Sequence, residues 1–494
     1  MNLRASLKNS FDSLADKARQ NRASWALFRV VRSFRLLHEL LMPQRFFAKT
    51  VVVADAANKK RASFSIWGNE SSLRYLLRRL EATGLSVVES VGRAFQPATE
   101  GAAESPEPKP SISFVWHNRA LSSKFSRRGW LVLPGQVRSR LDLSRDIDAI
   151  QAGFSRSAQR AGQMVKDSGY GFSVLPCKSL LHGFYNKMYL PYCESRFGSH
   201  PLVKPYELVE ALSKDSVLLT VSASASPVRP SLDNALGGVI IRKVNTSASL
   251  VISGLGGDPE DALRRGAVEA LYWFAILWCH SQGVISLDLG LSHPFLDDGV
   301  LRFKAKWGAR VEASETGLHN LALKFLDNGW LGKHFLQNHP PVVYARRQLL
   351  RRSRATAEPQ ALDRWWQAGK PAPHCQLPTA NCQLPTANLM GLAYLAPEDL
   401  SHRSLRRLRR SRMIEGLSEL VIVSDPESAP EAEGIVGETP TIRFLPCYDL
   451  RYLADALNAL AVGSSYVIDS EAELKSIKEA EQAFVSFVDR LCHR

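Results

Sequence analysis

The sequence predicts an α/β (α+β) protein in which a central mixed sheet is flanked by helices, with smaller α/β segments at both ends. Two observations support this fold class: the order of strand-length and helix-length apolar runs between residues 175 and 312, and the strand-like and helix-like runs on either side of them. The expected central elements are helices over 180–197 and 206–214, strands over 217–224, 235–243 and 247–254, a helix over 259–281, a strand over 283–290, a helix over 299–307 and a closing strand over 308–312.

A chain of 494 residues has room for roughly two to four domains. We expect a basic N-terminal segment over 1–48, a small α/β segment over 49–140, the central domain over 141–330, a basic, Pro-rich linker over 331–395 and a small C-terminal α/β region over 396–494. The linker contains the heptapeptide CQLPTAN twice, at 375–388. A tandem repeat of this kind indicates an insertion in a tolerant, exposed loop, so its cysteines are not expected to be ligands.

The formal net charge of +15 is unevenly distributed. Residues 141–315 carry 18 basic and 18 acidic side chains, whereas the first fifty residues carry ten basic and three acidic ones. Five arginines lie between Arg346 and Arg354 and six between Arg403 and Arg412. The excess charge therefore belongs to the flanks, where it suits a membrane surface, RNA or an acidic partner, or forms ordinary solvated faces.

Residues 24–42, SWALFRVVRSFRLLHELLM, have the periodicity of a basic amphipathic helix. Apolar side chains share one face and three arginines share another. Such a helix either lies on an anionic membrane surface or packs on its own protein core, and the sequence leaves both interpretations open.

The first residues lack the order of charged, apolar and small side chains that is typical of a secretory signal, and the longest apolar helical run, Ala267–Cys279, is shorter than the roughly 20 residues that cross a bilayer. We therefore expect a cytoplasmic protein, with a peripheral location at the inner face of the membrane as the alternative that residues 24–42 leave open. The seven cysteines are scattered and form no CxxC pair, and HExxH is absent, so we expect reduced thiols and no metal site.

Three segments resemble the FemAB-like branch of the GNAT acyltransferase superfamily. FSRSAQRAGQ at 154–163 is similar to the basic helix that opens such domains, and FYNKMYLPYCESRFGSHPL at 184–202 to the helix that follows. LDLGLSHPFLDDGVLRFKAKWGA at 287–309 is similar to the closing pattern of an acidic strand end, a glycine and F-K-x-x-W-G. The resemblance covers residues 141–315, and a degenerate first lobe of the same kind before residue 140 is a further hypothesis.

The resemblance implies that acyl-CoA (acetyl-CoA) is a co-substrate, bound in a cleft between two central strands. Its pyrophosphate would meet the glycine-rich turn before the long helix, where backbone N–H groups and the helix dipole favour an anion. The residues assigned to the donor on this basis are Gly254, Gly256, Gly257, Arg264, Arg265 and Gly266.

The same turn also fits an ordinary helix start. Asp258 is a candidate N-cap, Pro259 suits the first helical position, and Glu260 and Asp261 follow. Acids stabilise a helix start but repel a bound pyrophosphate, and the family's usual phosphate loop is not reproduced.

Three residues are candidates for chemistry. Asp288 ends a buried strand, where an acid is costly unless it is paired or contacts substrate. His293 lies in the next loop, as a general base or as a simple turn histidine. Lys304 belongs to the family pattern and either neutralises substrate charge or extends from its helix to solvent.

The first functional hypothesis is transfer of an acyl group, from acyl-CoA, to an amine or hydroxyl of a small molecule or glycan precursor, in cell-envelope or polysaccharide metabolism. The second is a Fem-type ligase that takes amino acids from aminoacyl-tRNA, for which the basic flanks are suited. The third is a non-catalytic module that keeps the fold for binding.

Overall fold

The computed structural model describes residues 47–55, 60–68, 70–93, 110–197, 203–223, 232–314, 319–344, 389–394, 414–424, 442–446, 449–454 and 457. The amphipathic segment 24–42, the CQLPTAN repeat and both arginine clusters lie outside these residues. Within them, no helix is both long enough and apolar enough to span a membrane. The described chain divides into unit 1, residues 138–292 and 299–311, and unit 2, which holds the rest.

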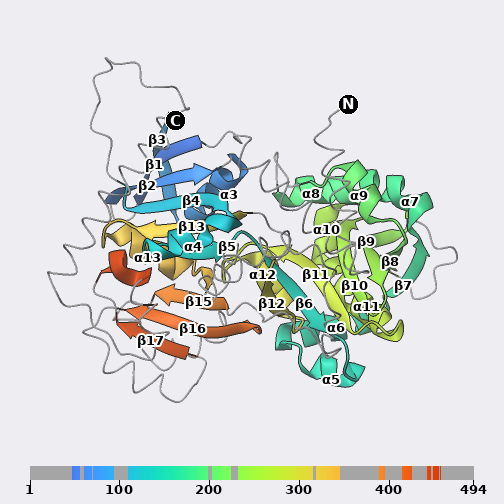
Figure 1. The fold of residues 1–494 in the computed structure, drawn as a ribbon. Helices are drawn as coiled ribbons and strands as arrows, with labels where there is room; N and C mark the ends of the chain where they lie inside the picture. Colours follow the sequence, from blue (N-terminus) through green and yellow to red (C-terminus); the bar gives the residue numbers. More distant parts are fainter. Residues whose placement is uncertain are drawn as a thin grey trace, which may run out of the picture. The chain divides into compact units, whose positions relative to one another are not determined.

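Unit 1 is built on a seven-stranded sheet of order β12-β6-β11-β10-β9-β8-β7 (Figure 1). Strands β7, β8, β9 and β10 pair antiparallel to one another in that order, and β11 pairs parallel to β10. Its elements are β6 (Val137–Asp142), α5 (Ile147–Ala152), α6 (Arg156–Asp167), β7 (Gly171–Pro176), α7 (Cys177–Phe184), the π-helical turn η2 (Tyr185–Tyr189), α8 (Leu190–Phe197), α9 (Tyr206–Leu212), β8 (Ser216–Ser222), β9 (Ala235–Val244), β10 (Ser247–Leu255), α10 (Pro259–Arg264), α11 (Ala267–Ser281), β11 (Ser286–Ser292), α12 (Gly299–Ala305) and β12 (Arg310–Ala313).

This topology confirms the predicted fold class. The three predicted strands are consecutive antiparallel neighbours in one sheet, and the predicted helix crosses from the third strand to a parallel fourth. Helices α6 and α11 cover one face of the sheet, whereas α7, η2 and α9 pack on β8, β9 and β10 from the other. The middle parts of β8 and β9 are therefore buried on both faces, which explains their nearly continuous apolar sequences.

Two predicted helices of unit 1 are interrupted. The helix expected over 259–281 breaks at Gly266, whose φ of +73° begins α11 as a separate helix. The helix expected over 180–197 contains the π-helical turn η2 between α7 and α8. Apolar periodicity continues through both breaks, so it did not reveal them.

Unit 2 contains a six-stranded sheet of order β3-β1-β2-β4-β13-β5 and a four-stranded sheet of order β14-β15-β16-β17. One apolar core includes side chains from both. Its elements are β1 (Phe47–Asp55), β2 (Lys60–Gly68), α3 (Glu70–Glu81), β3 (Leu85–Arg93), β4 (Ile112–Asn118), η1 (Arg119–Leu121), α4 (Ser122–Arg127), β5 (Leu131–Pro134), β13 (His319–Phe325), α13 (Trp330–Asn338), β14 (Val342–Tyr344), β15 (Leu389–Tyr394), β16 (Leu417–Ser424), β17 (Ile442–Pro446) and η5 (Leu450–Tyr452).

Two features of unit 2 differ from the predicted organisation. Strand β13 lies inside the range 141–330 that was predicted as the central domain, but it pairs with β4 and β5. The range 331–395, predicted as a linker, contains most of α13 and all of β14 and β15. Helix α13 forms here because Leu331, Phe335 and Leu336 share a face that is fully buried in the core of unit 2.

The buried His117 of β4 makes the stability of unit 2 sensitive to acid. Its ring Nδ1 donates to the carbonyl of Asn118 at 2.8 Å, and the side chain is 4% exposed. Burial lowers the pKa of His117 to about 4. The unfolded chain therefore takes up this proton first, and stability that is fully present above pH ~6.5 declines as the pH falls towards 4.

We expect the free energy of unfolding of the wild type to fall by roughly 2 kcal/mol between pH 7 and pH 4.5 because of this group alone. Urea denaturation of wild type and His117→Gln at both pH values measures it. The variant should lose that much less stability on acidification. Equal losses in the two proteins would exclude His117 as the cause.

Candidate active site

Strands β10 and β11 part after a short parallel ladder. Their pairing covers only Ser247–Ser249 of β10 and Ser286–Asp288 of β11, although β10 continues to Leu255. The cause lies in β11 itself: Asp288 Oδ1 accepts a hydrogen bond from Gly290 N at 2.8 Å, and Gly290 has a φ of +87°. Glycine adopts this left-handed backbone without a Cβ penalty, so β11 turns away from β10 at this point.

A bulge on β10 lies beside this opening. The register with β9 shifts between Leu250 and Ser253, so Val251 and Ile252 face one residue of the neighbouring strand. The carbonyl of Val251 accepts a hydrogen bond from Lys204 Nζ at 2.7 Å. The opening is thus lined by main-chain groups of β10 beyond Ser249 and by the Lys204 ammonium.

The π-helical turn η2 holds Lys204 in place. Tyr189 Oη accepts from the backbone N–H of Lys204 at 2.9 Å, and Tyr185 Oη donates to its carbonyl at 2.8 Å. The turn itself packs on β10, because a Cβ at Gly254 would lie 2.7 Å from the backbone of Met188 and Tyr189. Gly254 therefore serves the approach of η2 to the sheet, whereas the sequence assigned it to a phosphate.

Asp288 also forms an ion pair with Arg138 of β6, and both side chains are largely buried. Burial lowers the pKa of the Lys204 ammonium, the negative charge of Asp288 acts in the opposite direction, and Arg138 reinforces the lowering. Asp288, Arg138 and Lys204 are thus one electrostatically coupled group at the opening. The sequence left two roles open for Asp288, a structural pairing and a contact with substrate. The structure supplies the partners that the structural pairing requires, Arg138 and Gly290 N.

Lys304 supports the end of β11. Its ammonium donates to the carbonyl of Leu291 at 2.8 Å and to Ser292 Oγ at 3.2 Å, and the residue is 4% exposed. The solvent-extended lysine that the sequence allowed is therefore wrong, because the amine turns inward to the strand end.

His293 belongs to unit 2, whereas Asp288 and Lys304 belong to unit 1. Its ring stacks on Tyr75 with a centroid separation of 3.6 Å, and its pKa is lowered to about 4 by burial and by the charge of Arg79. The structure does not bring His293 together with Asp288 and Lys304 within one unit. A weakly basic, stacked ring fits packing better than proton transfer near neutral pH.

The glycine-rich turn after β10 is shaped by packing. A Cβ at Gly256 would overlap the carbonyl oxygen of Ala235, and the Gly256 N–H is already bonded to Leu236 O at 3.0 Å. Gly257 has a φ of +63° with open space around it. Gly266 provides the left-handed break before α11, and a Cβ there would meet the Met164 methyl.

We therefore expect Gly256→Val to lower the free energy of unfolding of unit 1 by about 3 kcal/mol, through overpacking against a strand carbonyl. If Gly256 only gave a donor phosphate room to approach, the variant would stay folded and lose donor binding alone, and the Ala235 contact argues against that. Thermal or urea unfolding measures the effect. Gly257→Ala, a matched control with open space around it, should lose only about 1–2 kcal/mol, from backbone strain. Unchanged stability of Gly256→Val would contradict the packing explanation.

The first turn of α10 is ordinary helix capping. Asp258 Oδ1 accepts from Glu260 N at 3.0 Å, and Pro259 has no N–H to offer. Asp261 lies 3.4 Å from Arg264 and 3.7 Å from Arg265, in exposed ion pairs. The N–H of Glu260 and both arginines assigned to the donor thus have intramolecular partners. The turn, as folded, fits a pyrophosphate poorly.

The described residues contain no group of three or more His, Cys, Asp or Glu side chains arranged to hold a metal ion. Two members of the site, Lys204 and Arg138, were absent from the sequence-based candidates. Lys204 could have been found from its place just after F-G-S-H-P at 197–201, which belongs to the stretch that resembles the FemAB-like branch. Nothing in the sequence of β6 singles out Arg138.

No protein-family model and no curated protein matches the chain. Unit 1 has a GNAT-type fold. Similar solved structures are FemX (11% identity, 56% of this chain and 88% of that chain, TM-score 0.30) and the C-terminal domain (DUF2156) of a putative lysylphosphatidylglycerol synthetase from Agrobacterium fabrum (12%, 53% and 78%, 0.28). A GCN5-related N-acetyltransferase from Kribbella flavida is also similar (10%, 64% and 66%, 0.23). These values decide nothing about chemistry, and the GNAT-type assignment depends on the strand order and the α10–α11 crossover.

Proposed function

We propose that the GNAT-type domain is an acyltransferase that presents an activated acyl group to an amine or hydroxyl in the opening between β10 and β11. The observation that carries the proposal is the parting of these strands after Ser249 and Asp288, which leaves main-chain groups of β10 without a neighbouring strand. A small molecule or a glycan precursor is the proposed acceptor.

The chemistry that such an opening supports is simple. The acceptor nitrogen or oxygen forms a bond to the acyl carbon, the bond to the leaving thiol or hydroxyl breaks, and the acceptor's proton leaves with that group. Main-chain N–H groups fixed on a strand stabilise the oxyanion that develops on the acyl group. An acceptor that is held close to the acyl carbon needs little further help from a general base. Asp288 holds Arg138 and the kink at Gly290, and so acts as a positioning residue.

Acyl-CoA is the donor that the N-acetyltransferase neighbour suggests. The acidic, already capped start of α10 opposes it, since the pyrophosphate would meet Glu260 and Asp261 there. That observation favours the second candidate, an aminoacyl-tRNA donor, which has no pyrophosphate to place at this turn.

One experiment separates the donors. The full-length protein is incubated with radiolabelled acetyl-CoA or with aminoacyl-tRNA and a panel of amine and hydroxyl acceptors, and labelled product is measured. Transfer from one donor supports the proposal and identifies the carrier. Transfer from neither donor to any acceptor would leave the binding-module hypothesis.

A charge variant tests the CoA alternative directly. Neutralising the first turn with Glu260→Gln and Asp261→Asn removes two repelling charges and releases Arg264 and Arg265 from Asp261. We expect CoA to bind about 10-fold more tightly, measured by calorimetric titration. Replacement of Asp146 and Asp148 by Asn, at the start of α5, is the matched control and should change nothing. If neither wild type nor the first-turn variant binds CoA, acyl-CoA is not the donor.

A further inference from the structure

The charges at the opening do not balance. Among the described residues, Arg138 forms an ion pair with Asp288, and the charges of both act on the Lys204 ammonium. With both cations protonated the group carries one surplus positive charge.

The two cations of this group, Arg138 and Lys204, also have hydrogen-bond donors that no described residue accepts from. Both Asp288 oxygens are in use, Oδ1 by Gly290 N and Oδ2 by Arg138. Among the described residues, the Lys204 ammonium donates to Val251 O alone, and the Arg138 guanidinium to Asp288 alone. Lys204 thus has two protons, and Arg138 further N–H groups, that a ligand can engage.

The position of Lys204 is fixed before any ligand arrives. Tyr185 and Tyr189 bond its carbonyl and its N–H, so the backbone pays little entropy when the ammonium binds. A partly buried cation with unmet donors is costly, and an oxyanion relieves that cost through charge-assisted hydrogen bonds.

We propose that the acceptor carries an oxyanion, a carboxylate or a phosphate, which Lys204 and Arg138 bind while its amine or hydroxyl faces the opening. That the bound molecule is an acyl acceptor rests on the proposed function. Binding of an anion by Lys204 and Arg138 can be measured without turnover. It makes Lys204 a specificity-determining residue that selects anionic over neutral acceptors.

Calorimetric titration of the full-length protein with matched amines tests this. O-phosphoethanolamine is compared with ethanolamine, and glycine with glycinamide, so that each pair differs in the anion. We expect saturable binding of at least one anionic member and at least about 10-fold weaker binding of its neutral partner. The pair that responds distinguishes phosphate from carboxylate.

Variants locate the site. Lys204→Met should weaken binding of the anionic amine about 10-fold or more, and Lys204→Arg should retain most of it. Lys243→Met is the matched control, because Lys243 Nζ also donates to a main-chain carbonyl, that of Gln282 at 2.7 Å, at an exposed position. Equal unfolding temperatures of the variants establish that the fold is intact.

The outcomes are distinct. No saturable binding of either anionic amine by wild type, or equal weakening by Lys204→Met and Lys243→Met, would overturn the anion site. Anion binding that depends on Lys204 in a protein that transfers from neither donor would support the site while the proposed function fails. Transfer to neutral and anionic acceptors with equal kcat/KM would overturn the specificity role alone and leave the proposed function standing.

Discussion

Asp288→Ala is expected to reduce acyl transfer about 100-fold or more. The substitution removes the acceptor for Gly290 N, which sets the kink in β11, and leaves the Arg138 guanidinium without its carboxylate. Loss of one partner of a largely buried ion pair costs roughly 3 kcal/mol or more, which corresponds to that factor when the lost geometry serves the transition state. The labelled-product assay with the active donor measures it.

Two further variants separate the contributions of Asp288. Asp288→Asn keeps an oxygen for Gly290 N but loses the charge, so its activity should lie between those of wild type and Asp288→Ala. Asp142→Ala is the matched control, since Asp142 Oδ1 caps Ser144 N at 2.9 Å in the same way, but from an exposed position on β6. If Asp288→Ala transfers as fast as Asp142→Ala, Asp288 has no part in the reaction.

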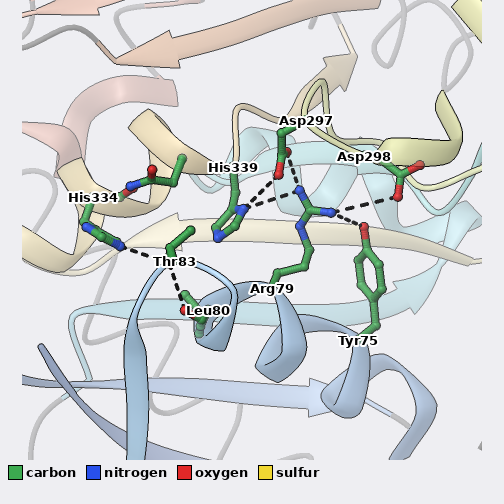
Figure 2. Close-up of polar contacts among 9 residues, drawn as sticks. Tyr75, Arg79, Leu80, Thr83, Asp297, Asp298, His334 and His339 are labelled. Atoms are coloured by element: carbon green, nitrogen blue, oxygen red, sulfur yellow. Dashed lines mark hydrogen bonds and ion pairs between the residues drawn. The ribbon is translucent and has the colours of Figure 1, made fainter. Parts of the chain in front are cut away.

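Arg79→Met is expected to destabilise unit 2 by about 3–5 kcal/mol. Figure 2 shows the Arg79 guanidinium between Asp297, Asp298, His339 and the hydroxyl of Tyr75. The Tyr75 hydroxyl is 2.9 Å away, Asp298 Oδ2 is 3.9 Å away, and Asp297 forms an ion pair with the same group. The Arg79 side chain is 10% exposed, so its removal leaves two poorly solvated carboxylates without their central cation.

Urea denaturation followed by fluorescence measures this loss. Arg127→Met, an exposed arginine of the same unit, is the control and should change stability by less than about 0.5 kcal/mol. Adding Asp297→Asn and Asp298→Asn to Arg79→Met should recover part of the loss, because the cost comes from uncompensated charge. A loss below about 1 kcal/mol in Arg79→Met would contradict a structural role for the cluster.

The sequence predicted much of unit 1 because its elements have clear local signals. Strands such as Ala235–Val244 are apolar on both faces, and the helix from Ala267 to Ser281 is apolar around most of its surface. Strong, local patterns of this kind determine the order of elements, and the order nearly determines a right-handed parallel crossover.

The site was predicted only in part, because its contacts join residues far apart in the chain. Arg138 and Asp288 are separated by 150 positions, and Lys204 and Val251 by 47. The assignment of Gly254 and Gly256 to the donor phosphate failed for a related reason. These positions require glycine because the backbone of Met188 and of Ala235 approaches closely, and the local sequence does not reveal such contacts. His293 similarly belongs to the Arg79 cluster through Tyr75, which lies more than 200 positions earlier.

Hydrogen–deuterium exchange tests most directly whether the opening between β10 and β11 holds the acyl group. The full-length protein is compared with and without a non-hydrolysable acetyl-CoA analogue, and with and without an amide-linked aminoacyl-tRNA analogue. We predict that one of the two slows exchange in peptides covering residues 250–255, beyond the short ladder with β11. Slowed exchange that is confined to other segments, with residues 250–255 unchanged by either analogue, would contradict the proposed site of acyl transfer.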